Sequence, residues 1–398
     1  MSLLLDHSGR RVSLAALGAL PGLMPLAILP AYLGALVSHG GYSASDAGVI
    51  CALNLLGNAL GVMWVSWRPS GRIVPILLMG FCLEVIADIL ASVLEPGNGL
   101  PFLRLIAGVG GGLFTGVGFR MIAASNKTDA GFGLLILLQF LLGALLLDQL
   151  PPLVEAYGVR IIYLIFIACA LLSTLAFFFL SLISKSTNVE GSDLLFSREN
   201  TQTGHPPRKT LNKLQASLAL LAIIAFEISA SGVWAYAEQI ASAWSISVED
   251  TAGALAWGAL AGIPGSFLVV LQGDRWGRLL PVVLAVLIAA LSLFWLSGLS
   301  GSDSVFLIAM LVFNFSWAYV VPYMQAEQAT LDETGQLATF GMSAVLLAIA
   351  YGPYLFSLFI ASDGHQTALT VCLALLMACV LFTILLAYFK RASGAQRS

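Results

Sequence analysis

The sequence has 398 residues, of which 59% are hydrophobic and only 10% are charged, and its net charge is −3. Soluble domains average about 45–50% apolar and about 25% charged residues. A water-soluble globule of this composition would lack polar side chains to cover its surface, which excludes most soluble enzymes, nucleic-acid-binding proteins and disordered scaffolds. The apolar runs are long and unbroken, unlike the short alternating strands of a membrane β-barrel. They predict an all-α integral membrane protein with many spans.

Twelve segments contain the roughly 20 mainly apolar residues that a transmembrane helix requires. The first is preceded by Arg10 and Arg11, but it is longer than the roughly 7–15 apolar residues of a secretory signal, so we expect an uncleaved span. Its Pro21 and Pro25 are expected to kink the helix, because proline lacks a backbone N–H. In chain order the predicted spans are residues 13–38, 44–66, 72–94, 101–124, 130–150, 159–183, 213–242, 250–272, 278–299, 303–328, 336–361 and 366–389.

A long polar segment separates the sixth span from the seventh. It predicts an N-terminal six-helix bundle (1–183), a cytoplasmic linker (184–212) and a C-terminal six-helix bundle (213–398). The halves also repeat, since Gly71-Arg72 opens the third span and Gly277-Arg278 opens the ninth, 206 residues later. Such a repeat predicts two bundles related by a pseudo-twofold axis, with a site at their interface, as in secondary transporters.

Lysine and arginine residues concentrate on one side of the predicted spans. With the N-terminus inside, 16 of the 18 lie in cytoplasmic segments or span ends, and only Arg104 and Arg160 lie on the outer side. Cytoplasmic loops of membrane proteins carry such an excess. We therefore expect a multi-pass protein of the plasma (inner) membrane with both termini in the cytoplasm.

The sequence predicts no cofactor, no metal site and no enzyme activity. All five cysteines lie inside apolar runs without paired spacing, as small core residues do, and the four histidines lie outside the spans. The glycines between residues 108 and 118 lie within a span, with no preceding strand and no following Gly-Lys-Ser/Thr. Close helix packing explains them better than a nucleotide-binding loop.

Three motifs resemble the major facilitator superfamily. Residues 274–278, Asp-Arg-Trp-Gly-Arg, match the family's D-R-x-G-R loop between spans eight and nine, whereas the equivalent first-half loop keeps only Gly71-Arg72 and lacks the acid. The fourth span begins Arg104-x-x-x-Gly108-x-Gly110, which is similar to the family's R-x-x-x-G-x-G element. Residues 157–160, Tyr-Gly-Val-Arg, resemble the usual lead-in to the sixth span.

The resemblance covers all twelve spans and implies alternating access between two six-helix bundles, with spans one, four, seven and ten lining the cavity. It also implies a cytoplasmic gate formed by Asp274, Arg275, Gly277, Arg278, Gly71 and Arg72. The fifth span lacks the G-P-x-x-G-G element of many drug–proton antiporters, which disfavours multidrug efflux.

Glu227 in the seventh span is the strongest candidate for a functional carboxyl group. It follows Lys213 by 14 residues, about 21 Å along a helix, and thus lies deep in the membrane. Ser231, Trp234 and Glu238 follow at i+4, i+7 and i+11 and share its helical face. Ionisable groups within a bilayer are costly and usually functional, so this stripe predicts a surface for substrate and protons. The alternative is a protonated Glu227 that hydrogen-bonds a neighbouring helix.

A second set of charges combines spans three and four. Glu84 and Asp88 share one helical face at i and i+4, and Arg104 enters the same half of the bilayer from outside. We expect the three to form a cluster, because unpaired buried charges are strongly destabilising. Two roles are open: a structural lock, which we favour, or a proton relay in which Arg104 changes partner.

Other polar side chains within the spans are weaker candidates. On family grounds we expect Asn314 and Trp317 to line the cavity, and Tyr32 and Gln139 are considered as substrate contacts or as packing residues. Asn54 and Asn58 share a face of the second span, where side-chain amides commonly join neighbouring helices.

These observations predict a secondary active transporter of a small organic solute, coupled to protons, that works as a monomer in the lipid bilayer without nucleic acid. The predicted cavity contains acidic groups, and Arg104 is the single basic residue that lies deep in the predicted spans. This balance of charge favours neutral, aromatic or cationic solutes. The alternative is a transport-inactive sensor or partner subunit with the same fold. Within transport, efflux antiport and uptake symport both stay open.

Overall fold

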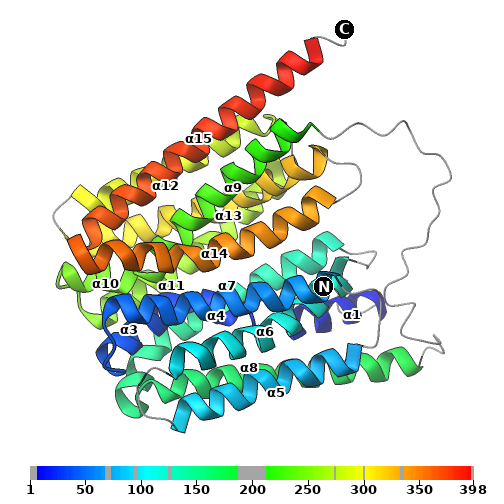
Figure 1. Cartoon of the computed structure of the whole chain (residues 1–398), viewed down its shortest axis with the longest axis vertical. Coiled ribbons are helices and arrows are strands. Elements are labelled where there is room, and N and C mark those ends of the chain that lie inside the picture. Colours follow the sequence, from blue (N-terminus) through cyan, green and yellow to red (C-terminus); the bar gives the residue numbers. More distant parts are fainter. Residues whose placement is uncertain are drawn as a thin grey trace. The chain divides into compact units, whose positions relative to one another are not determined.

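The computed structural model describes residues 7–67, 73–93, 97, 99–123, 128–186, 212–272, 275–298, 301–331 and 336–395, and it is all-α over these ranges. Fifteen helices occupy them (Figure 1): α1 (His7–Gly18), α2 (Met24–Ala27), α3 (Leu29–Ser38), α4 (Ala44–Trp67), α5 (Ile73–Val93), α6 (Leu100–Ala123), α7 (Thr128–Tyr157), α8 (Arg160–Ser186), α9 (Lys213–Ala235), α10 (Ala237–Ala243), α11 (Val248–Gln272), α12 (Leu279–Gly298), α13 (Asp303–Leu331), α14 (Gln336–Asp363) and α15 (His365–Ala395).

Eleven of these helices, within the described ranges, are long and apolar enough to cross a membrane: α4 to α9 and α11 to α15. The predicted first span is the exception, because it is divided into α1, α2 and α3. Pro21 lies in the turn between α1 and α2, while Pro25 and Pro30 lie in the first turns of α2 and α3. Each proline removes a helical hydrogen-bond donor. The interrupted backbone is buried in protein, which is where a membrane tolerates it.

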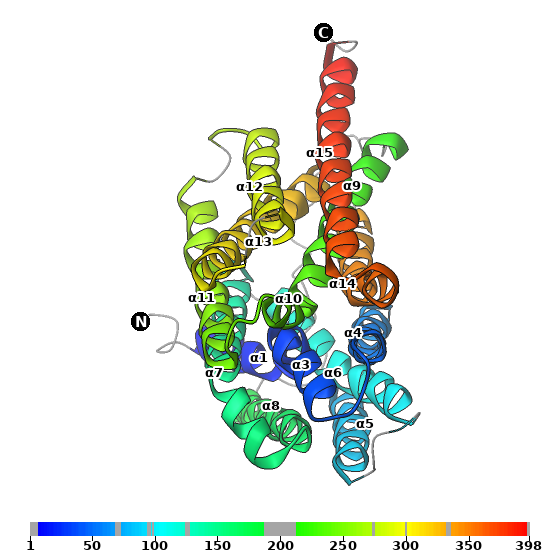
Figure 2. The same ribbon diagram turned by 90° about the vertical axis from the view of Figure 1, so that its left-hand side faces the viewer.

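The helices gather into two compact units, each of which is described separately. The first contains residues 1–42, 49–143 and 152–204, and the second contains residues 43–48, 144–151 and 205–398. In the first unit α5 packs between α6 and α8, and α1 also contacts α6 and α8. In the second unit α9 packs against α14 and α15, while α12 and α11 both contact α13 (Figure 2). The predicted linker lies mostly outside the described residues.

Glycines set the distance between α4 and α6 in the first unit. A Cβ atom on Gly61 of α4 would lie 2.9 Å from the Cα of Gly112 in α6, and one on Gly108 would lie 3.0 Å from the backbone nitrogen of Asn58. The two backbones therefore touch, with no room for a side chain between them. The glycine-rich stretch of α6 is a packing surface.

Candidate functional site

The first unit contains a buried ion pair between Arg104 of α6 and Asp88 of α5. Both side chains are 0% exposed, and Nη2 of Arg104 donates to Oδ1 of Asp88. Glu84 lies one helical turn before Asp88, on the same face of α5, and is also buried. The spacing in the sequence thus brings two carboxyl groups and one guanidinium into one buried cluster, which we call the Arg104 cluster.

Aromatic rings surround the guanidinium of Arg104. Its Cζ atom lies 4.9 Å from the ring centroid of Tyr163 and 5.9 Å from that of Phe166, both on α8. Tyr32 of α3 meets both rings edge-on, with centroids 6.3 and 5.8 Å away. Asn54 of α4 donates from Nδ2 to the backbone oxygen of Arg104, at 2.9 Å. Tyr32 therefore belongs to the Arg104 cluster, which sequence reasoning had treated separately.

The second unit buries Glu227 in a different environment. Its side chain, on α9, is 1% exposed, and the indole Nε1 of Trp317 on α13 donates to its Oε2 at 3.2 Å. Trp317 is half-buried, and its ring lies 5.9 Å from that of Phe313. An acid, an indole donor and a second aromatic ring thus converge from two helices.

The other residues of the predicted Glu227 stripe are Ser231, Trp234 and Glu238, whereas the 3.2 Å hydrogen bond to the Glu227 carboxylate comes from Trp317. The hydroxyl of Ser231 donates to the backbone oxygen of Glu227, at 2.7 Å, so that bond does not reach the carboxylate. Trp234 is buried in the last turn of α9. The helix ends there, and the half-buried Glu238 lies in α10 beyond a break at Tyr236. Glu238 therefore does not lie on one continuous helix with Glu227.

Asn314 makes its hydrogen bond within α13 and lies beside α11. It is buried, its Nδ2 donates to the backbone oxygen of Met310 at 3.0 Å, and it packs against Gly258 of α11. Five residues further along α13, the hydroxyl of Tyr319 donates to Oε1 of Gln272 on α11, at 2.6 Å. Gln139 lies half-buried on α7. The structure thus brings Trp317 to Glu227, while the hydrogen bond of Asn314 stays within α13.

Part of the predicted gate motif can be placed. Gly71, Arg72 and Asp274 lie outside the described residues. Arg275 is exposed, and Gly277 has a φ of +64°, a conformation that glycine adopts without strain.

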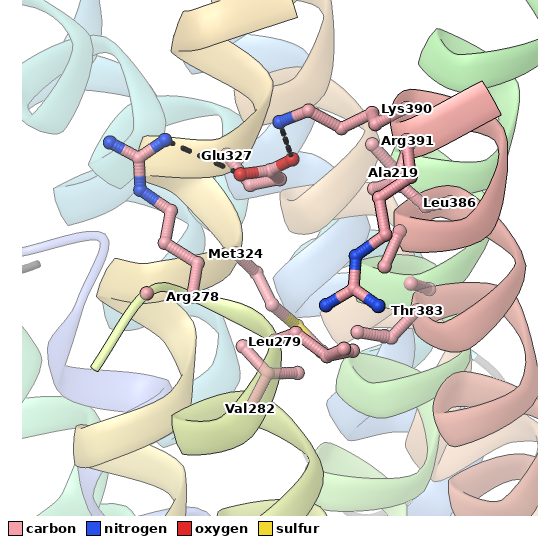
Figure 3. A pocket seen from close by; sticks show the side chains of 13 residues that line it. Ala219, Arg278, Leu279, Val282, Met324, Glu327, Thr383, Leu386, Lys390 and Arg391 are labelled. Atoms are coloured by element: carbon pink, nitrogen blue, oxygen red, sulfur yellow. Dashed lines mark hydrogen bonds and ion pairs between the residues drawn. The ribbon is translucent and has the colours of Figure 1, made fainter. Parts of the chain in front are cut away.

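Of the gate residues that the structure describes, Arg278 makes an ion pair. Its Nη1 lies 3.3 Å from Oε2 of Glu327 on α13, and Nζ of Lys390 on α15 lies 2.5 Å from the other carboxylate oxygen (Figure 3). Glu327 and Lys390 are not among the site residues predicted from the sequence. The available signal was that all three lie at predicted span ends on the same side of the membrane.

The described helices define a multi-pass membrane protein with buried ionisable groups in both units. Among the described residues, no three His, Cys, Asp or Glu side chains gather in the way a metal ion requires. No protein-family model and no curated protein sequence matches the chain. Solved structures do match it, over nearly its whole length.

One match is the xylose transporter XylE from E. coli in a partially occluded inward-open conformation. Its TM-score is 0.69, with 15% sequence identity over 95% of this chain and 98% of that one. Another is the human organic anion transporter MFSD10 (TETRAN), with a TM-score of 0.67 and 16% identity over 94% of this chain and 99% of that one. The chain therefore has the major facilitator superfamily transporter fold. Since the two proteins are named for a sugar and for organic anions, the likeness concerns the fold and not the solute.

Proposed function

We propose that this protein is a secondary active transporter that couples the movement of a small organic solute to protons by alternating access. The observation that carries the proposal is the fully buried Glu227, whose carboxylate accepts a hydrogen bond from the half-buried Trp317. The transporter fold supplies the context for this acid. Ionisable residues inside membrane helices commonly mark substrate and proton pathways.

The charges on the helices that pack against α9 support this role. The sequences of α13 and α14 contain no Lys or Arg, and the single base of α9 is Lys213, about 21 Å from Glu227 along the helix. On α15, Cys379 is a buried titratable neighbour of Glu227. The lysine and arginine residues of that helix, Lys390 and Arg391, begin about 16 Å further along it. Glu238 on α10 adds a second acid.

The buried carboxylate of Glu227 therefore has no Lys or Arg side chain beside it on α9, α13 or α14. It therefore becomes neutral by binding a proton or by meeting a cationic solute. Exchange between these two states is the elementary step of proton-coupled transport. The rings of Trp317 and Phe313 add surfaces that attract aromatic groups and cations. We propose a neutral, aromatic or cationic solute on this basis.

Reconstituted protein provides the test. Proteoliposomes containing the pH dye pyranine would receive tyramine, choline, xylose or benzoate, and the lumenal pH would be followed after each addition. Relative to protein-free liposomes, which account for the passive permeation of the weak acid and the weak base, we expect tyramine or choline to drive proton movement and benzoate to drive none. Glu227→Gln should abolish proton-driven accumulation while leaving exchange of solute across the membrane measurable. The matched control is Glu249→Gln, the same change at an exposed position on α11.

Two results would contradict the proposal in different ways. Full proton-driven accumulation by Glu227→Gln would show that protons are carried elsewhere, with the Arg104 cluster as the next candidate. A correctly folded wild-type protein that moves none of a wide range of solutes would favour the alternative, a sensor or partner subunit with a transporter fold.

The orientation is also a proposal. The distribution of Lys and Arg supports a plasma (inner) membrane location with both termini and the 184–212 segment in the cytoplasm. We propose in addition that residues 1–183 and 213–398 act as the two bundles of one monomer. Labelling of single cysteines introduced near each terminus, with a reagent that does not cross membranes, tests the orientation. Modification in intact cells would contradict it.

A further inference from the structure

The second unit contains a pocket of about 420 Å³ that is separate from Glu227 and Trp317 and shares Gly277 and Arg278 with the predicted gate motif. It lies between α9, α12, α13 and α15, and its charged lining comes from the ends of membrane spans. Arg278 immediately precedes α12, and Lys390 and Arg391 lie in the last turns of the α15 span. Such positions are level with lipid headgroups. The volume is within the range of small-molecule sites, about 300–1,000 Å³.

The charged residues of this pocket are strongly unbalanced. Arg278, Lys390 and Arg391 contribute three positive charges, and Glu327 contributes one negative charge, so the lining has a net charge of +2. The carboxylate of Glu327 is shared by Arg278 and Lys390, at 3.3 and 2.5 Å. The side chain of Arg391 is exposed and turns toward the interior of the pocket (Figure 3). One acid holds two of the cations in place, and the pocket as a whole attracts an anion.

The rest of the lining is mainly apolar, and its one hydroxyl, on Thr383, donates to the backbone oxygen of Cys379 at 2.8 Å. Ala219 and Ala222 of α9, Val282 of α12, Met324 of α13 and Leu386 of α15 contribute only hydrocarbon or thioether surface. A hydrophilic anion would leave these side chains uncovered. A ligand with an anionic head and a hydrocarbon tail satisfies both parts of the lining, and the bilayer supplies such molecules at the depth where the pocket lies.

We propose that this pocket binds an anionic phospholipid, with its phosphate between Arg278, Lys390 and Arg391 and the start of an acyl chain against the apolar wall. The lipid would bridge α12, α13 and α15, because each of these helices contributes to the charged lining. The site lies within one unit and needs no transported solute, so it stands independently of the proposed function.

Native mass spectrometry of the full-length protein in detergent, titrated with phosphatidylglycerol or phosphatidylcholine, tests the proposal. We expect phosphatidylglycerol to bind in preference to phosphatidylcholine, with one high-affinity equivalent. Lys390→Gln and Arg391→Gln should each weaken this binding at least about tenfold, because each removes a charge-assisted hydrogen bond to the phosphate. The matched control is Lys213→Gln, which removes an exposed positive charge at the start of α9 outside the pocket.

A second measurement needs no variant. Raising the salt from low to about 0.5 M should weaken the binding of phosphatidylglycerol to the wild-type protein and leave that of phosphatidylcholine unchanged, because salt screens charges. Equal affinity for both lipids, or no effect of either pocket substitution, would overturn the proposal. Glycerol 3-phosphate that binds as tightly as the lipid would also overturn it, in favour of a soluble phosphate compound.

Discussion

Replacing Arg104 with methionine tests whether the Arg104 cluster is a structural lock. Methionine preserves much of the length and apolar surface of the side chain but removes its charge. Asp88 and Glu84 would then be buried near each other without a cation. The guanidinium would also be lost from the faces of Tyr163 and Phe166. Each of these changes destabilises the folded state.

Two independent considerations set the size of the effect. Removing one partner of a buried pair costs about 3–5 kcal/mol, because the other charge is left uncompensated. Two unit charges about 4 Å apart attract each other by about 4 kcal/mol at an effective dielectric constant of 20. The two agree, so we expect Arg104→Met to lower the free energy of unfolding by about 4 kcal/mol. Loss of the ring contacts adds to this, and protonation of a carboxyl group reduces it.

The two carboxyl groups should respond differently to amide substitution. Asp88 makes the ion pair with Arg104, whereas Glu84 is the second acid beside a single cation. We therefore expect Asp88→Asn to be clearly destabilising and Glu84→Gln to change stability by less than about 1 kcal/mol. The double variant Arg104→Met with Asp88→Asn should recover part of the loss, with a coupling energy of about 2 kcal/mol or more.

Unfolding in mixed micelles, followed by the fluorescence of the eight tryptophans, gives these free energies. Strict additivity of Arg104→Met and Asp88→Asn would refute the reasoning, because it would mean that the two groups do not stabilise each other. A Glu84→Gln variant as unstable as Asp88→Asn would show instead that Glu84 holds the arginine. Proton coupling that disappears while stability is unchanged would favour the relay.

Three further outcomes are expected. Gly108→Ala should lower the free energy of unfolding by about 1–3 kcal/mol, because the new Cβ meets the α4 backbone. Gly133→Ala has open space around its Cβ, so it should leave the free energy of unfolding unchanged or raise it by up to about 1 kcal/mol. Equal effects of the two substitutions would contradict the close packing of α4 and α6. Trp317→Phe retains an aromatic ring but removes the indole donor, so proton flux in pyranine-loaded proteoliposomes should fall about fivefold, and wild-type flux would argue against the hydrogen bond. Tyr319→Phe leaves the buried Oε1 of Gln272 without its donor and should cost about 1–3 kcal/mol in the same unfolding assay; an unchanged stability would mean that water replaces the hydroxyl.

The sequence was most informative where contacts follow from helix geometry and short connections. Glu84 and Asp88 share a face by spacing alone, and Arg104 must come near them because α6 follows α5 after six residues. The Arg278–Glu327–Lys390 contacts join residues 49 and 63 positions apart. Their pairing depends on how α12, α13 and α15 pack together, and no local sequence pattern predicts that packing.

The helix breaks were predicted less well. Pro21 and Pro25 predicted a kink, but the first span is divided into three pieces. The break at Tyr236 is flanked by alanine on both sides, and Gly232, one turn earlier, is a weak helix-breaking signal. The stripe predicted from Glu227 to Glu238 depended on a continuous helix, whereas the structure divides that segment into α9 and α10 at Tyr236.

The Arg104 cluster also has a consequence for biogenesis. Each acid at the centre of a span opposes its entry from the translocon into lipid by about 2.5–3.5 kcal/mol, and α5 contains two of them. The ribosome synthesises Arg104 only 16 residues after Asp88. If the translocon holds the third span, α5, at its lateral opening until the fourth span, α6, emerges, the two spans would enter the lipid together as a hairpin. The charges of the Arg104 cluster would then already be paired. The arginine would then act first during synthesis, and its loss would appear as poor membrane integration of the nascent chain.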